Sequence, residues 1–412
     1  MKNKQQNLVE ITYTRAKSKY GDILPERVKK RIDKELKILE KFSNEILSSM
    51  SSLEKIKKIG LLVIPRTKIT NSFVFYLLGL SNVNPLPRHT YCPKCHTFYW
   101  GKHEKTKCEV CGEHLIEDGY TLPFEICEIR DDEFLKFDYS CAYHIVTNKG
   151  QVRTCEHSLL KLANLLNVSQ EDIDNIDVNK DINNILNCLD ESYYSKNYKN
   201  SHICNHRPFI GISDLGSELL KTLQEEYQVK DFDGLVKLCS MLHGTSVYDA
   251  NEENLIDINN PNIDDTICSR EDLFNFLIDQ QFSKEDATLM CRETRIGKLS
   301  SLSEQKLLDA NVDQKYIEYM RRVRYLFYKG YVVSHLKVAF VLAKIFLENP
   351  LRYYLAYFKI NKDLLEKIPA NPDYFKLLFD TKDYEMEKIY LGIIDLMERG
   401  FYPKNVLETV SQ

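Results

Sequence analysis

The sequence lacks the features that would place it at once in several large classes of protein. It has no run of roughly 18 apolar residues that would span a bilayer, and its N-terminal segment has no apolar core of a signal peptide. It also lacks a glycine-rich phosphate loop of Walker type, an HExxH helix, a GxSxG turn and a usefully spaced Cys/His dyad. We therefore expect a cytoplasmic protein that has no membrane partner and uses none of these common catalytic motifs.

A dominant charge of one sign is also missing. The 412 residues include 56 basic and 60 acidic side chains, so the formal net charge is only −4. Because no global field attracts nucleic acid or membranes, any such surface must be local. The length predicts two or three domains, each large enough to bury its own core.

The most informative feature that is present is a pair of C-x-x-C motifs. Cys92 and Cys95 form one, Cys108 and Cys111 form the other, and twelve residues separate them. Two residues between thiolates let both sulfurs reach one ion at about 2.3 Å, and four thiolates complete a tetrahedral site. We predict structural zinc; the alternatives are four unconnected buried thiols or two redox pairs. The other eight cysteines follow no framework, which together with a thiolate site indicates a reducing compartment.

The hydrophobic pattern of the N-terminal part predicts helices and one strand. Apolar residues recur at three- and four-residue steps over 23–50, which predicts one amphipathic helix with Pro25 in its first turn. Residues 60–80 predict a short buried strand that ends at Pro65 and a buried helix that stops before Gly79.

The remainder of the chain is expected to be almost entirely helical. The Asp-, Asn- and Lys-rich segment 165–200 predicts short solvated helices or a linker rather than a core element. Beyond Phe209, helical patterns continue nearly to the end, with a long helix around 332–347 and a last strong pattern closed by Gly400.

Several long phrases match one family in its order and spacing. The first block contains YGDILPERVKKRIDKELKILEK, IPRTKITNSFVFYLLGLSNVNPLPRHTYCPKC and CEVCGEHLIEDGYTLPFE. The second contains RPFIGISDLGSELLKTL, KLCSMLHGTSVYDANEENLI, CSREDLFNFLIDQQFSKEDATLMCRETRIGKL and FYKGYVVSHLKVAFVLAKIFLENPLRYYLAYFKI. Residues 20–125 and 205–410, roughly three quarters of the chain, thus resemble parts of the PolC-type alpha subunit of bacterial DNA polymerase III.

The resemblance implies a fold and a division of the chain. In the family the first block begins the palm domain and carries its zinc module, and the second is the helical fingers domain. We therefore expect a mainly α protein with a small α+β palm remnant. The expected parts are an N-terminal helix with a palm-like remnant (1–90), the zinc module (91–125), a degenerate palm remnant with a polar linker (126–205) and the fingers-like domain (206–412). The family's nuclease, phosphoesterase, duplex-binding and clamp-binding regions have no expected counterpart.

The metal-binding carboxylates of the family have no matching acids at the aligned positions of this sequence. Polymerases of this class hold two metal ions with carboxylates, and the family's D-x-D-x-N-F-S phrase aligns with residues 134–140. The two ligand positions then become Phe134 and Lys136, neither of which can hold Mg²⁺. A shifted register that recruits Asp131, Asp132 and Asp138 is the alternative.

Two further parts of the polymerase centre are weakened. The third family aspartate lies in a palm segment that this chain mostly lacks, and Asp190 echoes it only faintly. The family's Gly-Ser turn follows an arginine, whereas here Arg66 precedes Thr67 and Lys68, so the close approach of backbone amides to phosphate is compromised. We expect no catalytic residues and no Mg²⁺.

Basic residues of the fingers-like block fit phosphate contact better. Arg295 and Lys298 stand where the family has an RKGKG-like turn, and Lys329 matches a family lysine, whereas Tyr331 replaces the family's nearby histidine. Bases and aromatics interleave just upstream, a composition that suits phosphate contact with base stacking: Tyr316, Tyr319, Arg321, Arg322, Arg324, Tyr325 and Tyr328. The alternative is an amphipathic helix with a solvated basic face and half-buried tyrosines. Together with Arg66 and Lys68, these basic residues are the candidate nucleic-acid or phosphate ligands.

Other candidate sites are weaker. His202, Cys204 and His206 alternate, so with Cys188 they offer an alternative second metal site. The segment His243-Gly244-Thr245 matches a family loop between helices and is expected to be a structural turn. His103 and His114 flank the zinc loop and are expected to be exposed polar residues.

The sequence therefore predicts a non-catalytic relative of the polymerase that binds DNA or replisome proteins and modulates DNA replication. Two alternatives stay open. One is a genuine polymerase subunit whose catalytic residues come from another chain. The other is an interaction protein without affinity for nucleic acid.

Overall fold

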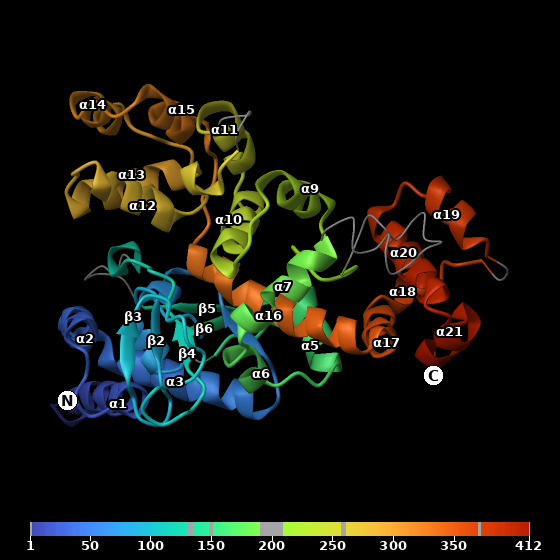
Figure 1. The fold of residues 1–412 in the computed structure, drawn as a ribbon, viewed down its shortest axis with the longest axis horizontal. Coiled ribbons are helices and arrows are strands. Elements are labelled where there is room, and N and C mark those ends of the chain that lie inside the picture. The colour runs from blue at the N-terminus through green and yellow to red at the C-terminus, as the bar shows by residue number, and fades with distance from the viewer. Residues whose placement is uncertain are drawn as a thin grey trace. The chain divides into compact units, whose positions relative to one another are not determined.

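The computed structural model describes residues 2–127, 129, 135–147, 151–189, 209–256, 261–369 and 372–411. Within these residues the chain is mainly helical with two small three-stranded sheets, which confirms the predicted fold class (Figure 1). Contacts divide the chain into two compact units. Unit 1 comprises Met1–Glu156, His243–Leu255 and Ile267–Ser334, and unit 2 comprises His157–Leu242, Ile256–Thr266 and His335–Gln412. The four-part division predicted from the family stays a prediction.

Residues 23–50 form two helices rather than the single helix that the pattern predicts. The elements at this end of unit 1 are α1 (Lys2–Tyr20), α2 (Glu26–Leu39), the 3-10 helix η1 (Glu40–Phe42) and α3 (Ser43–Lys58). The Ser43 hydroxyl donates to the carbonyl of Glu40, and this local bond competes with the α-helical pattern at the break. Pro25 is the N-cap of α2 rather than part of its first turn. The apolar positions that defined the predicted helix are nevertheless all buried.

The next segment follows the sequence prediction closely. A short buried strand, β1 (Val63–Pro65), precedes the 3-10 helix η2 (Lys68–Asn71) and the helix α4 (Phe73–Leu77). The chain leaves α4 through Gly79, whose φ of 71° lies in the left-handed region that glycine enters without steric cost. Buried Glu35 of α2 accepts hydrogen bonds from the backbone N–H groups of Phe73 and Val74, which fixes the start of α4.

Two separate sheets belong to unit 1. In the first, β5 (Phe137–Cys141) lies between β1, which is antiparallel to it, and β6 (Val152–Glu156), which is parallel to it. In the second, β2 (His89–Tyr91) lies between β3 (Phe98–Trp100) and β4 (Ile116–Asp118), and both pairings are antiparallel. The short 3-10 helix η3 (Phe124–Cys127) follows the second sheet.

The rest of unit 1 is helical and comes from the fingers-like block. Its helices are α11 (Val247–Asn254), α12 (Arg270–Asp279), α13 (Lys284–Arg295), α14 (Ser301–Asp309), α15 (Gln314–Arg322) and the first turns of α16 (Lys329–Glu348). The side chains of Ser269, Ser283 and Ser300 cap α12, α13 and α14 respectively. The loop before α11 contains the predicted turn, where Thr245 bonds to the backbone of Tyr325.

Unit 2 is built from helices that lie before residue 190 and after residue 208 in the sequence. They are α5 (Ser158–Leu165), α6 (Gln170–Asp174), α7 (Val178–Leu189), α9 (Glu218–Tyr227), most of α10 (Phe232–His243), η6 (Ile263–Asp265), α17 (Pro350–Ile360), α18 (Lys362–Leu365), α19 (Tyr374–Asp380), α20 (Tyr384–Glu398) and α21 (Pro403–Ser411). Gly400 ends the α20 segment, as predicted, with φ of 87°.

The prediction that 165–200 holds no core element is wrong for α7. Ile182, Ile185 and Leu189 are buried on one face of this helix. They recur at three- and four-residue steps, but the surrounding Asp and Asn residues hide the pattern in the composition.

One described helix is long and apolar enough to cross a membrane by length and composition alone. It is α16, and 83% of its most apolar window is buried inside the protein. Such burial is typical of a core helix, and it agrees with the long helix predicted around 332–347.

Candidate zinc centre and nucleic-acid interface

The four paired cysteines meet at one point in unit 1. Their sulfurs all lie within 4.8 Å of one another. Cys92 Sγ is 3.4 Å from Cys111 Sγ, and Cys95 Sγ is 3.4 Å from Cys108 Sγ. Sulfurs bound tetrahedrally at about 2.3 Å would stand about 3.8 Å apart, so a small outward movement admits a zinc ion. The arrangement excludes four unconnected thiols and fits one structural metal.

Local backbone geometry explains why each pair converges. His96 and Gly112 follow the second cysteine of their pairs, and both have positive φ, 60° and 75°. Each residue turns the chain back, and their N–H groups donate to the carbonyls of Cys92 and Cys108. A hydrogen bond with the Thr97 hydroxyl lowers the pKa of the Cys95 thiol to about 6, which favours the thiolate that binds metal.

The sequence alignment predicts that a metal-ligand position of the family falls at Lys136, beside the sheet formed by β1, β5 and β6. Lys136 is exposed just before β5, and Phe134, Asp131 and Asp132 lie outside the described residues. Asp138, on β5, forms a two-pronged ion pair with Arg153 on the parallel neighbour β6, with Nε and Nη2 at 2.9 and 3.1 Å from its two oxygens. A carboxylate held in this way is less available to a cation.

The Arg66-Thr67-Lys68 turn is fastened to the fingers-like helices of unit 1. The N–H of Arg66 donates to the carbonyl of Asp138, and Lys68 begins η2. At the end of η2, the Asn71 amide donates to buried Glu271 at 2.8 Å, and the other Glu271 oxygen accepts from the N–H of Lys329 at 2.8 Å. Burial raises the pKa of Glu271, although its hydrogen bonds with Lys329 and Asn71 oppose the shift. One carboxylate therefore ties the turn to the start of α16.

A close approach of backbone supports the same junction. A Cβ placed on Gly330 would lie 2.4 Å from Cβ of Thr70, so no other residue fits there without displacement. Lys68 and Lys329, which are far apart in sequence, are thereby brought into neighbouring segments.

Arg270 extends this group of cations. Its guanidinium stacks 3.7 Å above the ring centroid of Tyr328, and its Nε donates to the carbonyl of Leu326 at 2.7 Å. Burial lowers the pKa of Arg270, and the charge of nearby Arg295 acts in the same direction. Arg295 has a buried Nε with no hydrogen-bond partner among the described residues. The charge of Arg295 thus disfavours the charged form of Arg270, and the neighbouring Glu271 acts in the opposite direction.

Arg324 completes the group, which we call the cation cluster: Arg270, Arg295, Lys298, Arg324 and Lys329. The backbone of Arg324 lies against Gly297, where an added Cβ would be 3.3 Å from its Cα. In the described part of the chain, none of Arg295, Lys298, Arg324 and Lys329 forms an ion pair. Tyr325 and Tyr328 lie within this group, and Tyr325 is partly exposed.

Arg321 and Arg322 have a different environment from the cation cluster. Arg321 pairs with Glu304 and Glu318, and Arg322 pairs with Glu253. Tyr319 is fully buried and donates its hydroxyl to the carbonyl of Ile267. The interleaved segment predicted from sequence therefore splits into a part on α15, whose arginines pair with acids, and a later part, where Arg324 forms no ion pair with the described residues.

Sequence reasoning missed Arg270 and Glu271. The phrase CSREDLF gives no signal for them, because charged residues after a Ser N-cap are typical of any helix start. The predicted site of His202, Cys204 and His206, and the faint candidate Asp190, lie outside the described residues, while Cys188 is buried on α7.

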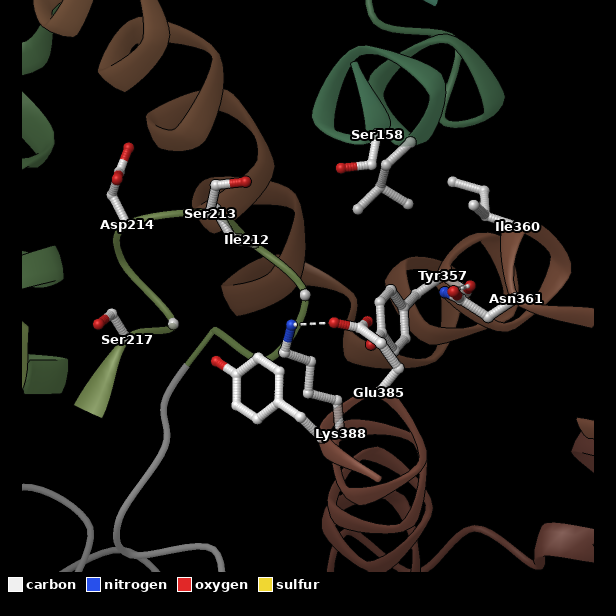
Figure 2. Close-up of a pocket in the computed structure, with 14 residues that line it drawn as sticks. Ser158, Ile212, Ser213, Asp214, Ser217, Tyr357, Ile360, Asn361, Glu385 and Lys388 are labelled. Atoms are coloured by element: carbon white, nitrogen blue, oxygen red, sulfur yellow. Dashed lines mark hydrogen bonds and ion pairs between the residues drawn. The ribbon is translucent and has the colours of Figure 1, made fainter. Parts of the chain in front are cut away.

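Unit 2 contains a small cavity of about 180 Å³ (Figure 2). Lys388 points into it and pairs with Glu385 at 3.0 Å, while its ammonium lies 4.0 Å from the ring centroid of Tyr384. Asp214, another lining residue, bonds to His335 Nδ1 at 2.8 Å. The charged residues that line this cavity thus already have ion-pair or hydrogen-bond partners, and no predicted site residue lies there.

Comparison with known proteins identifies the class to which this fold and these sites belong. A sequence model described as the bacterial DNA polymerase III alpha NTPase domain matches residues 6–260, and the chain belongs to that family.

The similar curated proteins are DNA polymerase III enzymes of PolC type. The one from Thermotoga petrophila is 23% identical, over 89% of this chain and 36% of its own length. Those from Pediococcus pentosaceus and Mycoplasma genitalium are 23% and 22% identical, over 88% and 94% of this chain. The chain spans about a third of the length of these relatives.

The alignment with the first of these relatives also contains many positions that this chain lacks. The alignment with the Thermotoga petrophila protein runs over 487 positions, yet 89% of this chain is only about 367 residues. About 120 aligned positions of the relative therefore have no counterpart here, in agreement with the expectation that this chain mostly lacks one palm segment.

Proposed function

We propose that this chain is a non-catalytic relative of the PolC-type polymerase that binds DNA in the cytoplasm and modulates DNA replication, alone or with replisome proteins. The observation that carries the proposal is the cation cluster: Arg270 contacts Tyr325 and Tyr328, and Arg295, Lys298, Arg324 and Lys329 form no ion pair among the described residues. Phosphates complement such a group, and bases stack on exposed tyrosine rings.

The side chains at the aligned positions support the proposed absence of catalysis. Lys136 places an ammonium where a metal-binding carboxylate is needed, and Asp138 is already held by Arg153. An ammonium beside a divalent cation is repulsive, so this sheet is not proposed to hold Mg²⁺. The cysteine group is proposed to hold one structural zinc ion.

A primer-extension assay tests the catalytic part of the proposal. Purified full-length chain with primed template, nucleotides and Mg²⁺ is expected to extend no primer. Extension that disappears in the Asp138→Ala variant would contradict the proposal, because it would show that the shifted carboxylates work. A PolC-type enzyme in the same buffer serves as the positive control.

A binding titration tests the DNA part. The Arg295→Ala/Arg324→Ala variant is expected to weaken binding to duplex DNA and to lower the slope of log K against log salt by about 1 to 2. Arg321→Ala/Arg322→Ala removes the same charge from residues that already have acid partners, so it is the matched control. Equal losses in both variants would show that bulk charge, and not the cation cluster, accounts for binding.

The missing 120 aligned positions favour a second candidate, a polymerase subunit that works with a separate palm-bearing chain. Copurification of such a chain, and primer extension only by the mixture, would support it over a modulator.

A further inference from the structure

One exposed face of α2 carries a line of basic residues outside the cation cluster. Its members are Arg27, Lys30, Lys34 and Lys37, and Lys41 follows in η1. All five are exposed, and they recur at three- and four-residue steps, so they lie on the side of the helix opposite its buried residues. We call these five residues the basic stripe. It extends for about 21 Å.

The exposed acids of the same helix lie on a line beside this stripe. Glu26, Asp33 and Glu40 recur every seven residues, at three- and four-residue spacings from stripe lysines that permit ion pairs. Asp33 instead accepts a hydrogen bond from the Tyr13 hydroxyl. The one ion pair between the two lines within α2, Lys30 with Glu26, joins two side chains that are 74% and 78% exposed, so its energy is small.

An aromatic ring lies at the beginning of the stripe. The guanidinium of Arg27 is 5.5 Å from the ring centroid of Trp100, the single tryptophan of the chain. Trp100 is half-buried on β3, so part of its surface is open beside the stripe.

A carboxylate shared by two lysines joins the stripe to α13. Glu125 Oε1 lies 2.7 Å from Lys34 Nζ and 2.9 Å from Lys284 Nζ. Although burial acts in the opposite direction, the hydrogen bonds of both lysines lower the pKa of Glu125 to about 2. Two cations on one carboxylate leave an excess positive charge. Lys284 begins α13 and Arg295 of the cation cluster ends it, so one helix connects the two basic regions of unit 1.

We propose that the basic stripe is a second nucleic-acid site, which binds the phosphate backbone beyond the cation cluster. A nucleic-acid strand offers a phosphate about every 3.4 Å of axis, so the five cations, spread over about 21 Å, can face a run of about six phosphates. The exposed edge of Trp100 favours nucleic acid over an acidic peptide, because bases stack on aromatic rings. The stripe extends the proposed function, and its test is independent of the cation cluster.

The test compares full-length variants in a salt titration with labelled duplex DNA and labelled single-stranded DNA. The Lys30→Ala/Lys37→Ala/Lys41→Ala variant is expected to lower the slope of log K against log salt by about 2 to 3 with the form that binds there. Lys362→Ala/Lys367→Ala/Lys376→Ala removes three exposed lysines from unit 2 and is expected to leave the slope unchanged. Circular dichroism confirms that each variant is folded.

Trp100 emission provides a second readout at the stripe itself. DNA is expected to quench it in the wild-type chain and in the unit 2 control, and to leave it unchanged in the stripe variant. An unchanged slope and unchanged quenching in the stripe variant would overturn the inference while leaving the proposed function intact. A loss in the stripe variant, with none in Arg295→Ala/Arg324→Ala, would support the stripe and overturn the cation cluster as the DNA site. Equal competition by polyglutamate of matched charge would overturn the assignment to nucleic acid.

Discussion

The zinc centre and the cation cluster, both in unit 1, are built in opposite ways. The four cysteines come from one segment of twenty residues, and two short turns bring them together. The cation cluster and the turn beside it draw residues from η2, α12, α13 and α16, which are joined by buried groups such as Glu271. A local site survives large changes elsewhere in the chain, whereas an assembled site depends on every segment that contributes to it.

The polymerase centre belongs to the second kind. Its carboxylates in the family come from separate palm segments, one of which falls in the region that this chain mostly lacks. By this comparison, the four cysteines can meet through local turns even in a chain with Lys136 at the expected ligand position.

Breaking the local site is expected to have the largest effect. Cys92→Ser with Cys108→Ser should release about one zinc ion per chain and unfold the hairpin module, because zinc binding contributes roughly 10 kcal/mol to folding in comparable small sites. Metal content by mass spectrometry and the thermal unfolding temperature provide the measurement. Cys155→Ser, an exposed cysteine outside the group, is the control and should change neither.

Breaking the assembled site at its buried carboxylate is expected to have an intermediate effect. Glu271→Ala leaves the Asn71 amide and the Lys329 N–H buried without their acceptor, so the free energy of unfolding should fall by about 2 to 4 kcal/mol. Glu271→Gln keeps one acceptor oxygen and should cost less. Denaturant midpoints measure both. Equal stability of the alanine variant and the wild type would show that the hydrogen bonds of Glu271 do not stabilise this junction. Zinc content should be unchanged in both variants.

The smallest expected effect is a pH dependence at Glu125. Because its pKa is lowered in the folded chain from 4.5 to about 2, its ion pairs stabilise the fold fully above pH 4.5, and this contribution disappears as the pH falls towards 2. The difference in unfolding free energy between wild type and Glu125→Gln should therefore shrink over that interval. A difference that stays constant with pH would show that the two lysine contacts contribute little in solution.

The sequence predicted local features better than assembled ones. The cysteine spacing, the strand that ends at Pro65 and the helix around 332–347 all depend on residues close together in the chain, and the structure confirms that the cysteines meet and that both elements form. The break at Ser43 depends on one side-chain hydrogen bond that periodicity does not register.

The candidate interface was predicted only in part. Residue type and family phrases pointed to Arg295, Arg324 and Lys329, but they also pointed to Arg321 and Arg322, whose acid partners lie up to 69 residues away in sequence. Tertiary packing brings these acids to the two arginines, so no pattern along the chain reveals that the charges of the arginines are neutralised. The same reason hid Arg270, whose stacking on Tyr328 joins two segments far apart in the chain.

The ion pair between Asp138 and Arg153 also bears on the design of a metal site on this sheet. Introducing a carboxylate at position 136 would place a new acid near one that is already paired across β5 and β6. Recruiting Asp138 as a second ligand would then require a further change at Arg153, and neither change alone yields a metal-binding pair. A designed two-carboxylate metal site on this sheet is therefore expected to need changes at both Lys136 and Arg153.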